Sequence, residues 1–200
     1  MESSNNKQND VLCAAIHEFA RRGLAGTTME AIAKKATVSK RTLYKHYANK
    51  QALFDEVVSL LLARIAQLQS YQYLKDIPIY DQLKDLAKLC LSLGNDEDYL
   101  TLSRIVIIES MRDKEQAARL EVKFLDCEKG LLTWFEQAQS AGVLNDVPAD
   151  IAAAFFYGGL KKMAYWEQVI KWKPALDEAR LEQLVDLTSR FFISGIKLEK

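Results

Sequence analysis

The sequence contains little glycine and proline, with 8 and 3 residues among 200. A β-sandwich or barrel needs many tight turns, so this scarcity argues against a loop-rich β fold and favours helices. Hydrophobic residues make up 49% of the chain, which is enough to form a core. The length fits one large domain, or a small domain joined to a larger one.

Cysteine and histidine are also scarce. Cys13, Cys90 and Cys127 are far apart and odd in number, so they form neither a disulfide framework nor a metal-ligand pattern. His17 lies four residues after Cys13, but the sequence shows no obvious acid to orient it. The sequence also lacks a glycine-rich phosphate loop and a nucleophile motif. We therefore expect no enzymatic activity, no metal and no cofactor.

Long apolar runs are missing as well. The most apolar stretch, Ile151–Leu160, is about half as long as a membrane span. The polar N-terminus lacks the apolar segment of a signal peptide. These features predict a soluble, cytoplasmic protein with no membrane partner.

The formal net charge is +0, so the whole chain has no overall attraction to a polyanion. The charges are nevertheless unevenly distributed. Residues 1–50 carry nine Lys/Arg and four Asp/Glu, and the remainder has an excess of five acids. A basic first quarter on an acidic remainder is typical of a chain whose one end meets a polyanion. A chance fluctuation is the alternative that charge alone leaves open.

Hydrophobic periodicity predicts about nine helices and no strand, an all-α fold. The first helix is predicted from about Asp10 to Gly23, after an N-terminal segment without regular structure. A second begins at Thr27 or Thr28, where Thr27 and Glu30 have the spacing of a capping box. The other predicted helices begin at Ser39 and Asn49 and cover about 79–93, 95–111, 113–140, 148–172 and 177–196.

Residues 27–47 combine two short helices with a three-residue turn, the geometry of a helix–turn–helix. On the second helix, Leu43 and Tyr47 share one face, which suits packing. Charged and polar side chains, including Arg41 and Lys45, point the opposite way. Lys40 and Arg41 lie in the first turn of this helix, where cations oppose the helix dipole. Their presence there favours a phosphate or a base edge as their partner. An ordinary solvated basic face is the alternative.

Three segments carry a family resemblance: Gly26-Thr-Thr-Met-Glu-Ala-Ile-Ala33, Val38-Ser-Lys-Arg-Thr-Leu-Tyr-Lys-His-Tyr47 and Asn49-Lys-Gln-Ala-Leu53. Across residues 10–58 the chain resembles the tetracycline-repressor (TetR/AcrR) family. The resemblance implies a dimer with a three-helix DNA-binding domain over residues 1–50 and a connecting helix from residue 50. It implies a helical regulatory and dimerisation domain over residues 51–200.

Carried over residue by residue, the resemblance implies a set of DNA contacts. Thr28 would offer its backbone N–H and hydroxyl to a phosphate, and Tyr44 would reach a thymine methyl group or a phosphate. His46 and Lys50 would touch the DNA backbone. The residues facing the groove would be Ser39, Lys40, Arg41, Thr42 and Lys45. Thr37 stands where the family usually has glycine in the turn, which predicts a strained or altered turn because a β-branched residue disfavours positive φ.

The C-terminal part is less informative. Residues 141–156, Ala-Gly-Val-Leu-Asn-Asp-Val-Pro-Ala-Asp-Ile-Ala-Ala-Ala-Phe-Phe, resemble the AefR-like branch of the family. That resemblance implies that the last two helices pair across a two-fold axis, although an intramolecular core is an alternative for their apolar stripe. The predicted dimer contacts are Phe155, Gly158, Gly159, Lys162, Leu181, Leu184, Val185, Thr188 and Phe192.

The resemblance also implies a small-molecule pocket in the C-terminal part, for which an apolar or amphipathic ligand is the default expectation. The candidate lining residues are Met111, Trp134, Phe155, Tyr165 and Trp166. We therefore predict a regulator of a palindromic operator, a repressor that a small molecule relieves. The alternative is a DNA-bound protein whose C-terminal part contacts another protein. A closed cavity favours the first, and a solid core with an exposed apolar patch favours the second.

Overall fold

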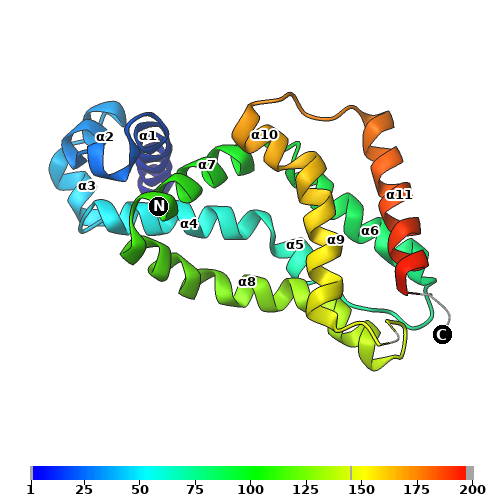
Figure 1. Cartoon of the computed structure of the whole chain (residues 1–200). Coiled ribbons are helices and arrows are strands. Elements are labelled where there is room, and N and C mark those ends of the chain that lie inside the picture. The colour runs from blue at the N-terminus through cyan, green and yellow to red at the C-terminus, as the bar shows by residue number, and fades with distance from the viewer. Residues whose placement is uncertain (1, 145, 197–200) are drawn as a thin grey trace. The chain divides into compact units, whose positions relative to one another are not determined.

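A computed structural model describes residues 2–144 and 146–196. Over these residues the fold is all-α, as predicted, with eleven helical segments and no strand (Figure 1). None of these helices is long and apolar enough to cross a bilayer. The helices are α1 (Glu2–Gly26), α2 (Met29–Lys35), α3 (Lys40–His46), α4 (Lys50–Arg64), α5 (Ala66–Gln69), α6 (Ile79–Leu93), α7 (Glu97–Arg112), α8 (Lys114–Ser140), α9 (Ala149–Ala164), α10 (Trp166–Lys171) and α11 (Glu178–Ile196).

The structure has more helical segments than the nine predicted because two of the predicted helices are interrupted at positions without glycine or proline. Ile65 separates α4 from α5 with φ −99° and ψ 2°. Tyr165 separates α9 from α10 with φ −134° and ψ −58°. The start of α1 also differs, because the helix begins at Glu2 and not near Asp10. The polar residues before Asp10 were predicted to lack regular structure, so the predicted start of the first helix was too late.

The chain divides into two compact units. The N-terminal unit comprises the residues up to Ala63 together with Thr101–Glu121, and the C-terminal unit comprises Arg64–Leu100 and the residues from Val122 onward. The predicted functional boundary at residue 50 stays a prediction. The packing nevertheless places α4 with the first three helices, since the rings of Phe19 and Phe54 meet edge to face at 6.0 Å.

The core of the N-terminal unit contains side chains from both helices of the helix–turn–helix and from α4. Ile32 on α2 and Leu43 on α3 are completely buried, and so is Phe54 on α4. Burying these side chains stabilises two helices that are too short to be stable alone. The core thus fixes the orientation of α3.

The core of the C-terminal unit is built on aromatic side chains of α8, α9 and α11. Phe135 lies at the centre, with ring centroids 5.7 Å from Phe156 and 5.8 Å from Phe192. Trp134 is also buried, and its indole N–H donates to the side-chain oxygen of buried Gln82 at 3.1 Å. At the end of α6, a side chain at Gly94 would come within 1.7 Å of the Ala164 carbonyl oxygen, so only glycine allows this contact with α9.

Candidate DNA-binding surface

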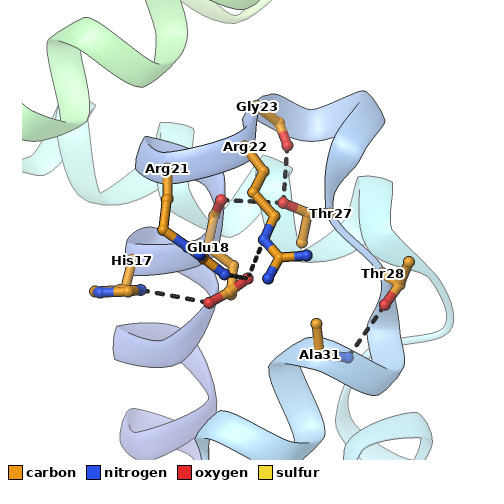
Figure 2. Close-up of polar contacts among 8 residues, drawn as sticks. All are labelled: His17, Glu18, Arg21, Arg22, Gly23, Thr27, Thr28 and Ala31. Carbon is orange, nitrogen blue, oxygen red and sulfur yellow. Dashed lines mark hydrogen bonds and ion pairs between the residues drawn. The ribbon is translucent and has the colours of Figure 1, made fainter.

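Two adjacent threonines at the start of α2 have different tasks (Figure 2). Thr28 is the N-cap, and its hydroxyl oxygen accepts the Ala31 N–H at 3.1 Å. Thr27 is buried, and its hydroxyl donates to the carbonyl oxygens of Gly23 at 2.8 Å and Glu18 at 3.1 Å. Of the two starts that the sequence allowed, the structure therefore has Thr28, and the predicted capping role of Thr27 is wrong.

The backbone of α1 kinks at Gly23, with φ 70° and ψ 174°, and helical structure continues to Gly26. The kink frees the N–H of Leu24, which donates to a carboxylate oxygen of Glu109 on α7 at 2.9 Å. Glu109 is 5% exposed, and a side chain at Gly23 would come within 2.8 Å of its carboxylate and 2.4 Å of the Arg112 guanidinium. Glycine is therefore favoured at position 23 for two reasons: the backbone has a positive φ, and α7 lies too close for a side chain.

A buried carboxylate on α1 gathers three basic side chains (Figure 2). Glu18 lies 3.1 Å from the Arg22 Nε, 3.5 Å from an Arg21 guanidinium nitrogen and 3.5 Å from the His17 Nδ1. Burial by itself raises the pKa of Glu18, but the charges of Arg21 and Arg22 outweigh it and hold that pKa below its ordinary value. Two of the cations counted in the basic first quarter are therefore already paired with an acid.

The turn of the helix–turn–helix is a Schellman motif that closes α2. The N–H of Val38 donates to the Ala33 carbonyl at 3.0 Å, and the N–H of Thr37 donates to the Lys34 carbonyl at 3.2 Å. Thr37 itself has φ 55°, in the left-handed region that favours glycine. The turn therefore keeps its usual hydrogen bonds while a β-branched residue adopts a strained backbone conformation.

Helix α3 begins where the sequence predicts. Ser39 is the N-cap, and its hydroxyl oxygen accepts the Thr42 N–H at 3.0 Å and lies 2.9 Å from the Thr42 hydroxyl. Leu43 and Tyr47 are buried, which confirms their structural role. One face of this short helix is therefore committed to the core of the N-terminal unit.

The opposite face of α3 is open. Arg41 and Lys45 are exposed and Tyr44 is 47% exposed, and none of them forms a hydrogen bond or ion pair with another described residue. Lys40 differs, because its ammonium group lies 2.8 Å from the Glu30 carboxylate on α2. The hydrogen bond from Lys40 lowers the pKa of Glu30. The side chains of Arg41, Tyr44 and Lys45 are thus available to a partner such as DNA, whereas that of Lys40 is paired with Glu30.

The remaining predicted contacts lie around this face. Thr28 and Ser39 are exposed, whereas Thr42 and His46 are half-buried. Lys50 is also half-buried, and its ammonium group donates to the Ala25 carbonyl at 3.2 Å. Asn49 caps α4 as predicted, since its side-chain oxygen accepts the Ala52 N–H at 2.9 Å. Their contacts with DNA stay predictions.

Sequence reasoning missed two exposed cations at the end of α2, Lys34 and Lys35. They follow the buried residues Ile32 and Ala33 and come directly before the turn. Cations in the last turn of a helix interact favourably with the helix dipole, so this structural role is enough to explain why the two lysines are there. The charge count over residues 1–50 was the signal that could have found them.

A second feature lies in the C-terminal unit, where α9 and α11 border an apolar groove of about 460 Å³. The most exposed large side chains on it are Phe155, 76% exposed, and Phe191, 74% exposed. Gly159, Thr188 and Phe192, predicted as dimer contacts, also line it. Gly158, Lys162 and Leu181 are at least partly exposed, but Leu184 and Val185 are buried in the core of the single chain.

The predicted pocket residues of the C-terminal unit lie in different surroundings. Trp134 is in the core, and Phe155 lies on the groove. Tyr165 packs against Trp166, with ring centroids 4.9 Å apart. Met111 belongs to the N-terminal unit and is 83% exposed. A shared pocket for these residues thus has no support from their positions.

Comparisons with known proteins agree with this architecture. The chain is 32% identical over 80 residues to the uncharacterized HTH-type transcriptional regulator YhgD of Bacillus subtilis, a match that covers 40% of this chain and 42% of YhgD. The chain thus matches less than half the length of this curated relative.

Two solved structures match over nearly their whole length. A TetR family transcriptional regulator from Pseudomonas syringae pv. tomato superposes with a TM-score of 0.80 at 29% identity, covering 94% of this chain and 95% of that one. The flavonoid-responsive regulator FrrA superposes with a TM-score of 0.69 at 27% identity, covering 96% and 97%.

Two family models match the chain. Residues 11–57 match the bacterial regulatory proteins of the tetR family, and residues 81–194 match the C-terminal domain of AefR-like transcriptional repressors. The second match alone covers more than half of the chain. The chain therefore belongs to the tetR family of bacterial regulatory proteins, as a helix–turn–helix transcriptional regulator with an AefR-like C-terminal domain.

Proposed function

We propose that two copies of this chain bind a palindromic operator, each inserting α3 into the major groove. The observation that carries this proposal is the open face of α3. Arg41, Tyr44 and Lys45 are exposed there, and their side chains have no partner among the described residues, while Leu43 and Tyr47 hold the opposite face in the core. Guanidinium and ammonium groups on a helix of this kind recognise guanine edges and phosphates.

The groove between α9 and α11 supports pairing of two copies. Phe155 and Phe191 expose most of their side chains to solvent in the single chain, and a second copy would cover them. Phe191→Glu should therefore abolish the dimer, because a charge would enter an apolar interface. Light scattering at micromolar concentration should show half the wild-type mass. Unchanged mass in a folded variant would exclude this face.

Phe191 is a sharper test than the neighbouring Phe192. The Phe192 ring meets Phe135 and Phe156 within the same chain, at 5.8 and 5.3 Å, so a charge there would disturb the core. Ser194→Glu is the matched control, because Ser194 is exposed on the same helix but does not line the groove. The control should leave the dimer mass unchanged.

We further propose that the regulator is a repressor and that a small apolar or amphipathic molecule weakens its hold on the operator. Two things support this proposal: the AefR-like repressor domain and the likeness to FrrA, a flavonoid-responsive regulator. Such coupling requires that the ligand and the operator favour different states of the protein. Selection of binding sites from genomic DNA would supply the operator on which release is measured.

The DNA-binding proposal is tested by three substitutions on operator and scrambled duplexes at several salt concentrations. Arg41→Ala and Lys45→Ala should cost more on the operator than on the scrambled duplex, by about 1–3 kcal/mol for each lost base contact. Lys50→Ala should weaken both duplexes alike, because a phosphate contact carries no sequence information. Each substitution acts twice in a dimer, so the measured effects should be about double.

The results separate two kinds of contact. Equal losses on both duplexes for Arg41→Ala and Lys45→Ala would mean that these residues position the protein without reading sequence. No loss on either duplex would show that α3 is not the recognition helix.

A further inference from the structure

Tyr157 on α9 carries a buried hydroxyl group that no described residue satisfies. The side chain is 7% exposed, and its oxygen has no hydrogen-bond partner in the part of the chain that the structure describes. Its ring packs edge to face against Phe135 and Phe156, at 5.6 Å from each. A phenol in apolar surroundings normally finds a partner for its O–H, so this group is available to a ligand.

Lys161 lies one helical turn further along the same face of α9. It is half-buried, and its ammonium group forms no ion pair or hydrogen bond with another described residue. The lysines nearby differ, because Lys162 and Lys171 lie 3.2 and 2.8 Å from the Glu167 carboxylate. Lys161 is therefore a partly buried cation, and no described residue of the unit supplies an anion for it.

Side chains on other helices of the C-terminal unit interact with Lys161 and Tyr157. Burial raises the pKa of the Cys90 thiol on α6 to about 11, and the charge of Lys161 opposes that rise. Burial likewise raises the pKa of Cys127 on α8, where Gln69 and Lys161 act in the opposite direction. The charge of Lys161 therefore acts on buried thiols of two other helices, α6 and α8.

We propose that the C-terminal unit binds a small organic anion, whose carboxylate or phosphate group accepts hydrogen bonds from the Tyr157 hydroxyl and the Lys161 ammonium group. Such a group has several acceptor positions and a negative charge, so one ligand group satisfies both donors. The neighbouring side chains are aromatic rings and neutral thiols, which suit an apolar skeleton. This inference rests on the proposed response to a small molecule, and it assigns the chemical class of that molecule.

The test compares four probes that share a ten-carbon chain and differ in the head group: the anions decanoate and decyl phosphate, the neutral decan-1-ol and the cation decylamine. A third anion, 1-naphthoate, supplies an aromatic skeleton. At least one anion should raise the melting temperature of the full chain, with the alcohol and the amine much weaker. Binding of the alcohol as tightly as the matched anion would overturn the proposal, and so would the failure of all three anions to bind.

Variants then locate the site. Lys161→Met should weaken the anion by about tenfold or more, and Tyr157→Phe by a smaller factor, because a hydrogen bond to a charged group is lost in each case. Lys88→Met, which removes an exposed cation of α6, is the matched control and should bind normally. Tyr157→Phe should also leave the stability of the unliganded protein unchanged, since no described residue bonds its hydroxyl. Full anion binding by Lys161→Met would overturn the assignment.

An operator-binding measurement distinguishes this site from the proposed function. Anion binding that depends on Lys161 but leaves operator affinity unchanged would keep the site and refute the proposed ligand response. Release of the operator by a neutral molecule, with equal effect on Lys161→Met, would keep the ligand response and refute this site.

Discussion

The ion pair between Glu30 and Lys40 gives a quantitative prediction about DNA binding. The two charged groups are 2.8 Å apart, and their side chains are 54% and 61% exposed. Because Lys40 lowers the pKa of Glu30, the carboxylate is fully ionised at neutral pH and competes with phosphate for the lysine. Glu30→Gln keeps the shape of the side chain, removes this competition and frees one cation on each α3.

The expected magnitude follows from counterion release. Each additional phosphate that a cation neutralises steepens the plot of log K against log salt by about 0.9. Two freed Lys40 side chains in a dimer should therefore steepen the slope by about 1.8 and tighten binding most at low salt. Fluorescence anisotropy of a labelled scrambled duplex at four or more salt concentrations measures the slope directly.

A control separates this local effect from a change in net charge. Glu182→Gln removes an equal charge from the exposed surface of α11, in the C-terminal unit, and should leave the slope unchanged. A Glu30→Gln slope equal to that of the wild type would refute the reasoning, because Lys40 would then reach no phosphate once released. Equal slopes for the two variants, both steeper than wild type, would indicate a general charge effect.

Two further predictions concern stability and pH. Thr37→Gly should raise the free energy of unfolding by about 1 kcal/mol, because glycine adopts the left-handed conformation without strain and loses only part of this gain to its greater freedom when unfolded; a urea midpoint at or below that of the wild type would show that the turn is unstrained. Hydrogen bonds from Lys171, Lys173 and Lys162 lower the pKa of Glu167 from 4.5 to about 2. The stability that Glu167 contributes should therefore be complete above pH 4.5, decline as the pH falls and be lost below about 2. Carboxyl NMR should place the midpoint near 2, and an ordinary midpoint would mean that the three lysines do not hold the carboxylate.

The parts of the site that the sequence predicts well depend on short-range interactions. Ser39 and Asn49 each cap a helix through a hydrogen bond to an N–H three residues later, so their type and spacing are sufficient. The capping prediction at Thr27 failed because another local interaction competes for the same hydroxyl. The hydroxyl donates to carbonyl groups of α1 that lie four and nine residues earlier, at the end of α1 that kinks at Gly23.

The distribution of charge shows a similar limit. Counting charges over residues 1–50 gives an excess of five cations, but the count cannot show which of them are paired. Glu18 gathers Arg21 and Arg22 through the helical spacing of three and four residues, which a helical wheel could have revealed. The pair between Glu30 and Lys40 spans two helices, so it required the fold.

In the C-terminal unit, hydrophobic periodicity predicts where the helices are better than it predicts what their apolar faces contact. Helix α11 does carry apolar residues at helical spacing, but some of them are buried within the chain and others are exposed. Leu184 and Val185 are buried in the chain's own core, while the more exposed Phe191 was not among the predicted contacts. The hydrophobic pattern of one helix does not tell which of its apolar residues meet the same chain and which remain for another.

The different tasks of Thr27 and Thr28 affect how relatives of this protein should be compared. A search pattern that scores the two threonines together detects chains that fold this way, since one hydroxyl closes the kinked end of α1 and the other caps α2. Such a pattern carries no information about the operator. Sorting relatives by the DNA sequence they recognise should instead weigh positions 41, 44 and 45, whose side chains play no part in holding the helices together.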